Sequence, residues 1–208
     1  ILYFARRVDL QSADMHDHSW NSRLMPGAKN RTLGLVGFGG IGTEVAKRAV
    51  PFGMKVIYFC RHPNPADDAA YGVQSVSMEE LLKESDYVVA AVPLTDQTFH
   101  LFNEECIAQM KAGSVLINIA RGPVVDEEAL AQALASGHLG GCAVDGFPKE
   151  PCTDSVLTRY SNALLTPHSA TSTAENSKAT NFAAANNLVN YLKKDIDAKY
   201  VVVQGTRY

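Results

Sequence analysis

A short glycine-rich segment has the spacing needed to bind a pyrophosphate. The segment Gly37-Phe38-Gly39-Gly40-Ile41-Gly42 has the pattern G-x-G-x-x-G, follows an apolar run and opens a helical one. In this context the first glycine permits a tight turn, the second lets the backbone approach a pyrophosphate, and the third lets helix pack on strand. Free N–H groups at the helix start would bind the anion. The alternative is a tight turn without a ligand, but the flanking pattern favours dinucleotide binding.

The end of the next apolar run bears on the choice of cofactor. An acid is expected there to bind the ribose 2′-hydroxyl, but Cys60 holds the place and is followed by Arg61 and His62. A guanidinium can bind a 2′-phosphate through charge-assisted hydrogen bonds, whereas a carboxylate would repel it. The sequence thus favours NADP(H) over NAD(H). Alternatively, Arg61 is a solvated loop residue and Cys60 a small buried hydrophobe.

Three later segments place charged side chains at the ends of apolar runs. They contain, in chain order, Arg121, then Asp145 with Glu150, then His168. Taken singly, these residues would more often be a surface cation, turn residues and a cap. If the runs are parallel strands, however, their carboxyl ends share one crevice, and we expect the four side chains to converge on the bound cofactor.

From Thr32 onward, short apolar runs alternate with helical patterns, which is typical of βαβ units in a parallel sheet. We therefore predict an α/β fold of the Rossmann type, with a doubly wound parallel sheet. The expected strands are Thr32–Val36, Lys55–Cys60, Val73–Val76, Tyr87–Val92, Val115–Ile119, Gly141–Val144 and Ala163–Leu165. The expected helices are Ile41–Phe52 ended by Gly53, Met78–Glu84 with a capping box of Ser77 and Glu80, Glu127–Ser136 capped by Asp126, and Thr173–Lys193.

The two ends of the chain are less regular. Ile1–Arg7 is apolar and basic and is predicted to end a helix, whereas Gln11–Lys29 is polar and aperiodic and is predicted to be a loop. Tyr200–Val203 is predicted to form a short terminal strand.

Composition excludes several classes of protein. The 208 residues carry a formal net charge of −3 and have no basic stripe, so nucleic acid is not expected as a partner. No apolar stretch is long enough to span a bilayer. The four cysteines form no C-x-x-C pair, which favours reduced thiols and a cytoplasmic location. His16-Asp17-His18 lacks further ligands nearby, so no metal site is predicted.

The order and spacing of these motifs resemble the D-isomer-specific 2-hydroxyacid dehydrogenase family, of the glyoxylate or hydroxypyruvate reductase kind. The resemblance extends from Thr32 onward and rests on the glycine turn, Val92-Pro93-Leu94-Thr95, Asn118-x-Ala-Arg-Gly, Asp145-x-Phe-x-x-Glu-Pro and Pro167-His168.

The resemblance implies roles for the polar residues. Arg121 would bind the carboxylate and carbonyl of a 2-oxo acid, His168 would be the acid/base, and Glu150 would pair with it and raise its pKa. Asp145 would meet the nicotinamide carboxamide. The other expected cofactor contacts are Gly37, Gly39, Gly40, Ile41, Gly42, Cys60, Arg61, Val92, Pro93, Thr98, Ile119 and His168.

The resemblance also implies a domain plan. Residues 1–30 would be an interdomain helix and loop, 31–170 the NAD(P)-binding domain, and 171–208 a helix and tail returning toward a substrate domain whose N-terminal part is missing. We therefore expect this polypeptide alone to bind cofactor weakly and to turn over poorly or not at all. Gly146, where larger apolar residues are usual, should leave the loop before Glu150 more flexible.

Two further expectations follow from the resemblance. Homodimerisation through the nucleotide domain is implied, with Gln11–Lys29 as a contact. The alternative function is a dinucleotide-sensing binding protein of the C-terminal binding protein (corepressor) kind, which shares this fold and these catalytic residues; a degenerate enzyme without its substrate domain is a third possibility.

Overall fold

A computed structural model describes residues 1–195, 197 and 200. Within it the chain forms two compact units, residues 1–167 and 168–208. The first contains the sheet and the helices around it, and the second contains the long helix α8, Ala174–Leu192. Among the described residues no helix is long and apolar enough to cross a membrane.

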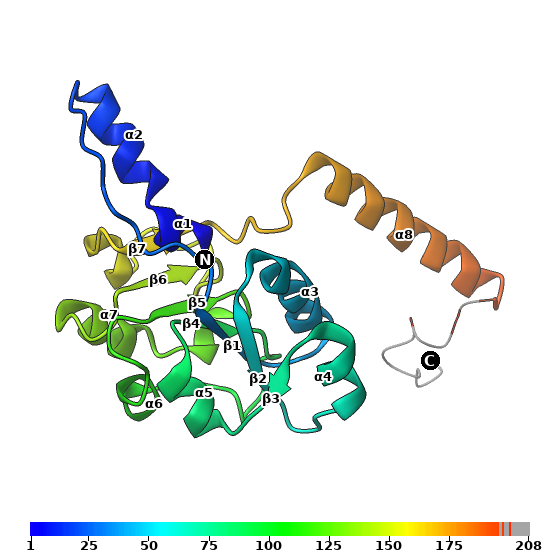
Figure 1. Cartoon of the computed structure of the whole chain (residues 1–208). Coiled ribbons are helices and arrows are strands. Elements are labelled where there is room, and N and C mark those ends of the chain that lie inside the picture. The colour runs from blue at the N-terminus through cyan, green and yellow to red at the C-terminus, as the bar shows by residue number, and fades with distance from the viewer. Residues whose placement is uncertain (196, 198–199, 201–208) are drawn as a thin grey trace. The chain divides into compact units, whose positions relative to one another are not determined.

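The first unit is built on one parallel sheet of seven strands (Figure 1). The strands are β1 (Thr32–Val36), β2 (Lys55–Phe59), β3 (Gln74–Ser75), β4 (Tyr87–Ala90), β5 (Val115–Asn118), β6 (Gly141–Val144) and β7 (Ala163–Leu165), in the order β3-β2-β1-β4-β5-β6-β7. The order reverses between β1 and β4, so the chain runs outward from the centre in both directions. This is the doubly wound arrangement, and a ligand crevice is expected at the reversal.

Helices cover both faces of this sheet. They are α3 (Gly40–Ala49), continued by the 3-10 turn Val50–Phe52, then α4 (Pro65–Tyr71), α5 (Met78–Glu84), α6 (Glu104–Ala108) and α7 (Glu127–Ala135). Two further 3-10 turns span Gly122–Val124 and Val156–Arg159. The predicted ends are confirmed where capping chemistry marked them: Ser77 accepts from the Glu80 N–H, Asp126 caps α7, and Gly53 ends its helix with φ 73°.

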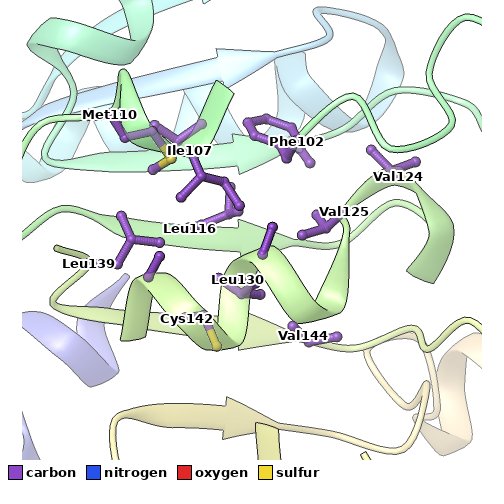
Figure 2. Close-up of a cluster of buried hydrophobic side chains, with 14 of the residues drawn as sticks. Phe102, Ile107, Met110, Leu116, Val124, Val125, Leu130, Leu139, Cys142 and Val144 are labelled. Atoms are coloured by element: carbon purple, nitrogen blue, oxygen red, sulfur yellow. The ribbon is translucent and has the colours of Figure 1, made fainter. Parts of the chain in front are cut away.

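Alternation along the strands divides the core into two apolar clusters, one on each face. Tyr87 and Val89 belong to the cluster under α3, whereas Val88 and Ala90 belong to the cluster under α5, α6 and α7. Figure 2 shows the second cluster, in which Phe102, Ile107 and Leu130 meet Leu116 of strand β5, which lies between β4 and β6. Both faces are apolar, which explains why the strands appear in the sequence as continuous apolar runs.

The N-terminal segment corrects one prediction. Residues 11–16, expected in a loop, belong to a helix: α1 (Leu2–Arg6) is followed by α2 (Val8–His16), with Arg7 between them at φ 40°. Arg7 makes a bidentate pair with Asp9, and its guanidinium lies over the Tyr3 ring. None of the residues of α2 is buried, so this helix has no apolar stripe through which sequence periodicity could reveal it.

Other differences are smaller. The ends predicted for β2, β4 and β5 extend one or two residues too far, because Cys60, Val92 and Ile119 already belong to the loops that line the crevice. The short helices α4 and α6 were not predicted. The predicted strand Tyr200–Val203 lies largely outside the described residues.

Candidate active site

The glycine turn connects β1 to α3 and has the geometry that its sequence predicted. Gly37 has φ 103°, and a Cβ at this position would lie 2.5 Å from the Ala91 carbonyl oxygen of the neighbouring strand end. Its N–H donates to the Phe59 carbonyl at 2.9 Å. Gly37 is therefore fixed between β2 and β4 in a conformation that L side chains rarely adopt.

Of the remaining glycines of the turn, Gly39 and Gly40 face open space and Gly42 is closely packed. A Cβ on Gly39 or Gly40 would have no atom within 4 Å, whereas one on Gly42 would collide with the Gly37 carbonyl oxygen. Gly42 thus brings α3 close to β1, and the space beside Gly39 and Gly40 is open at the first turn of the helix, where backbone N–H groups lack intrahelical partners. The turn fits a pyrophosphate group by this test.

A crevice of about 520 Å³ lies between the turn and the loops after β2 and β4. It is lined by Val36, Gly37, Phe38, Gly39, Phe59, Cys60, Arg61, His62, Ala91, Val92, Pro93, Thr95, Gln97, Thr98 and Leu101. Among these described lining residues there is no carboxylate. Arg61 and His62 are exposed at its edge and make no side-chain hydrogen bond or ion pair with any described residue.

The carboxylate of Asp68, in the helix that follows this loop, is hydrogen-bonded to a tyrosine and does not line the crevice. Asp68 of α4 accepts a hydrogen bond from the Tyr58 hydroxyl at 2.7 Å. Burial, together with this carboxylate, raises the pKa of Tyr58 to about 12. The bond fastens α4 to β2 behind the loop that carries Arg61.

A second hollow of about 510 Å³ continues the crevice toward Arg121. It shares Gly39, Ala91, Val92 and Pro93 with the first and adds Gly40, Ile41, Leu94, Ile119, Ala120 and Arg121. The two hollows are adjacent because they share these four residues, and together, as the groove, they extend from the residues predicted for the cofactor phosphates to the arginine predicted for the substrate. This is the observation on which the functional proposal depends.

Thr98 lines the groove, but its hydroxyl is already engaged. It donates to the Pro93 carbonyl at 2.6 Å and accepts from the Thr95 N–H at 2.8 Å. Thr98 therefore closes the loop after β4. Its predicted contact with the cofactor stays a prediction.

The backbone of Arg121 is held by Asn118, a residue of the same motif for which the sequence predicted no role. Asn118, at the end of β5, is only 2% exposed; its side chain donates to the Arg121 carbonyl and accepts from the Ala120 N–H, each at 3.0 Å. The guanidinium of Arg121 is exposed and donates to the Ala120 carbonyl at 3.0 Å.

The loop that follows β6 lies against the Arg121 loop. A Cβ on Gly122 would collide with the peptide joining Phe147 and Pro148, so the two backbones are in direct contact. The Phe147 N–H donates to Glu150 Oε1 at 2.9 Å, which ties this carboxylate to its own loop. Asp145 accepts from the Thr166 hydroxyl at 2.6 Å.

The structure brings the loops of three of the predicted site residues together within the first unit. The first unit brings together the loops of Arg121, Asp145 and Glu150 at the carboxyl ends of β5 and β6. His168 is the first residue of the second unit and has φ 49°. Its meeting with Arg121 and Glu150 stays a prediction. Within the described residues no group of three or more His, Cys, Asp or Glu side chains could hold a metal ion.

The seven-stranded parallel sheet, its order and the glycine turn at the reversal together define a Rossmann-type dinucleotide-binding domain. Comparison with known proteins specifies the class further. Residues 1–170 match the model of the NAD binding domain of the D-isomer specific 2-hydroxyacid dehydrogenases. The chain belongs to this family, and residues 1–170 are an NAD-binding domain.

Individual relatives agree with this assignment. The chain is 38% identical to a glyoxylate reductase of Thermococcus litoralis over 97% of its length and 63% of the relative. It is 40% identical to a hydroxypyruvate reductase of Thermotoga maritima over 84% of its length and 58% of the relative. A D-lactate dehydrogenase structure from Aquifex aeolicus, with NAD and lactic acid, aligns with TM-score 0.85 and 30% identity over 93% of this chain and 64% of that one. The chain thus spans about 60% of the length of these proteins.

Proposed function

We propose that the protein containing this chain transfers a hydride between NAD(P)H and a small 2-oxo acid, interconverting it with the D-2-hydroxy acid. The proposal rests on the groove that continues from the glycine turn to Arg121. Relatives with names of this kind, glyoxylate reductase and hydroxypyruvate reductase, support it. The bound nicotinamide would supply or accept the hydride at the substrate C2.

The side chains would perform the remaining steps. Arg121 would pair with the substrate carboxylate and polarise the ketone, since its exposed guanidinium lies at the end of the groove and a planar fork suits a carboxylate. His168 would give a proton to the developing alkoxide oxygen and take it back in the reverse direction. Glu150 would stabilise the protonated imidazole.

The cofactor would be held along the groove. Gly39, Gly40 and Ile41 would present N–H groups to the pyrophosphate, with Gly37 and Gly42 shaping the turn. Val92, Pro93 and Ile119 would form the apolar walls, and Asp145 would accept from the carboxamide.

We further propose that NADP(H) is preferred to NAD(H). Arg61 and His62 border the groove beside Cys60, no described lining residue is an acid, and Asp68 is engaged with Tyr58. A 2′-phosphate placed there would meet a free guanidinium and no like charge.

Titration of the chain with NADPH and with NADH, at one fixed salt concentration, tests the preference. We expect NADPH to bind at least about tenfold more tightly, which corresponds to roughly 1.4 kcal/mol, and Arg61→Ala to remove most of the difference. Arg159→Ala, at an exposed site outside the groove, is the matched control. Equal affinities in the wild type would overturn the preference.

Oxalate, a stable dianion resembling a 2-oxo acid, tests the role of Arg121. We expect oxalate to bind the NADPH complex and Arg121→Ala to abolish this binding while NADPH affinity stays within about twofold of wild type. Retained oxalate binding in Arg121→Ala would show that another residue holds the carboxylate.

We also propose that the protein works as a homodimer in the cytoplasm. The segment from α2 to Gly27 supports the first part, because large apolar side chains on it are exposed, among them Trp20 at 85%. The four cysteines are all free and support the second part.

A further inference from the structure

Arg121 lies between two anchors that fix its backbone. Before it, Asn118 ends strand β5; after it, Gly122 lies against the Phe147–Pro148 peptide so closely that a Cβ would not fit. Arg121 itself is extended, with φ −131° and ψ 148°. Its side chain is exposed, so packing around the guanidinium cannot hold it in one direction.

Asn118 is the anchor that acts through hydrogen bonds of its buried side chain. A buried carboxamide is costly unless its donors and acceptor are bonded. Here Nδ2 donates to the Arg121 carbonyl and Oδ1 accepts from the Ala120 N–H, so one side chain clamps both ends of the turn. The Arg121 carbonyl also accepts from the Val124 N–H at 3.0 Å, which links the clamp to the following 3-10 turn.

The clamp reaches the guanidinium through the backbone of one residue, Ala120. Arg121 Nη1 donates to the Ala120 carbonyl oxygen, and the N–H of the same residue is the group that Asn118 holds. The backbone N–H of Asp145 also donates to the Asn118 carbonyl at 3.2 Å, so the clamp stands where β5 meets β6. Orientation of the Ala120 backbone therefore sets the starting direction of the arginine fork.

We propose that Asn118 is a positioning residue that directs Arg121 toward the substrate carboxylate by clamping the turn 118–121. This inference rests on the proposed role of Arg121 in substrate binding. It adds that the arginine is preset by a buried amide before any substrate arrives, which lowers the ordering cost of binding.

Asn118→Ala, which removes both bonds, tests the proposal, with Ser114→Ala as its control. Ser114 lies just before the other end of β5 and is equally buried at 2%; among the described residues its hydroxyl has no hydrogen-bond partner. Four quantities are measured: the heteronuclear NOE of the Arg121 Nε–H, the exchange rate of the Ala120 amide, the affinity for NADPH, and the oxalate affinity of the NADPH complex.

In Asn118→Ala we expect Ala120 exchange to accelerate about tenfold, the factor for one lost hydrogen bond. The Arg121 NOE should fall, oxalate should bind about tenfold more weakly, and NADPH affinity should stay within about twofold of wild type. Ser114→Ala should leave all four unchanged. A folded Asn118→Ala with the NOE and exchange rate of the control would overturn the proposal.

Asn118→Asp is the second variant and serves if the alanine variant does not fold. It keeps an acceptor for the Ala120 N–H but loses the donor to the Arg121 carbonyl, so it should lower the NOE and oxalate affinity with little change in Ala120 exchange. An unchanged NOE in this variant would also contradict the clamp. If wild type binds NADPH but not oxalate, the role of Arg121 in the proposed function fails, while the two NMR quantities still decide whether Asn118 clamps the turn.

Discussion

At the scale of single residues, two glycines of the Arg121 and Glu150 loops look alike in the sequence but differ in what surrounds them. Gly122 lies directly against the Phe147–Pro148 backbone, which leaves no room for a Cβ. A Cβ on Gly146 would lie 3.5 Å from Glu150 Oε1 and 3.8 Å from Arg121 Cα, which are ordinary van der Waals distances. Only at Gly122 does backbone proximity require glycine. The flexibility expected at Gly146 is therefore removable.

Gly146→Ala is expected to raise the free energy of unfolding by about 0.4–1 kcal/mol. The added methyl has room, the backbone at this position is outside the left-handed region, and alanine reduces the entropy of the unfolded chain. Urea unfolding at pH 7 measures the change. Gly122→Ala, the matched variant on the facing loop, should lose at least about 1–3 kcal/mol, because a backbone atom stands where its Cβ would go. A loss of stability in Gly146→Ala would contradict the space found there.

The sequence predicted the tight turn at Gly37 and the close packing at Gly42 because both follow from local spacing, whereas the pyrophosphate contact of Gly39 stays a prediction. The roles of Asn118 and Gly122 could not be predicted in this way. Asn118 matters through burial and through a turn that forms only after β5 is placed, and Gly122 matters through a backbone 25 residues farther along the chain. Such contacts depend on the tertiary fold.

At the scale of elements, β1 and β4 are joined at their amino ends by Asp86. Its carboxylate, 16% exposed, accepts from the Thr32 N–H at 2.9 Å, from Lys111 at 2.8 Å and from Arg31 at 3.3 Å. Burial opposes ionisation, but the hydrogen bonds from Lys111 and Thr32 and the charges of Lys111 and Arg31 outweigh it, so the pKa of Asp86 is lowered. These hydrogen bonds of Asp86 connect two central strands at the edge of the sheet opposite the groove.

This lowered pKa predicts a stability that depends on pH. Because the folded pKa lies below the unfolded value of about 3.9, the contribution of Asp86 is fully present above that value and is lost as pH falls through the folded pKa. We expect Asp86→Asn to cost about 1–3 kcal/mol at pH 7 and to unfold with a shallower loss of stability below pH 4. Urea unfolding from pH 7 to pH 3 measures both effects.

Asp96→Asn, at an exposed position in the loop after β4, is the control for this change of charge and should follow wild type throughout. If Asp86→Asn showed the same acid limb as wild type, the stability lost in acid would come from other carboxylates.

Packing between β1 and α5 gives a second prediction at this scale. Gly34, in the middle of β1, would place a Cβ 2.6 Å from Leu81 Cδ2 and closer still to the Ser85 hydroxyl, which is buried and bonded to the Leu81 carbonyl. We expect Gly34→Ala to lower the free energy of unfolding by about 1–3 kcal/mol through overpacking. Gly34→Ala combined with Leu81→Ala should recover part of this loss relative to the sum of the single variants, measured by the same unfolding assay. Strict additivity would show that the clash is relieved elsewhere.

Elements with two-sided burial or clear caps were predicted from the sequence nearly to the residue, as β1, β6 and α5 show. Helix α2 was not, because its residues are polar or exposed and carry no 3.6-residue stripe. It is held instead by the Arg7–Asp9 pair and by contacts with the segment that returns beside it.

At the scale of the whole molecule, the first unit carries an exposed arm, residues 8–27, that Figure 1 shows extending away from the sheet. The arm is folded and not loose: Arg23 makes a bidentate pair with Asp14, both bonds at 2.9 Å, and the Gly27 N–H returns to the Ala5 carbonyl at 3.3 Å. Trp20 and Leu24 are largely exposed on it. Ordered apolar side chains without cover are typical of a surface that meets a partner.

A second copy of the chain is the partner implied by the proposed homodimer, and the arm makes that proposal testable. We expect wild type to sediment as a dimer at micromolar concentration and Trp20→Ser with Leu24→Ser to sediment as a monomer, because the buried apolar area of the interface is lost. NADPH affinity should stay near wild type, since the groove lies elsewhere. Phe52→Ser, at a side chain 54% exposed after α3, is the matched control and should leave the dimer intact. A wild-type monomer at all concentrations would contradict the homodimer, and a dimer that survives the double substitution would show that its interface does not depend on the arm.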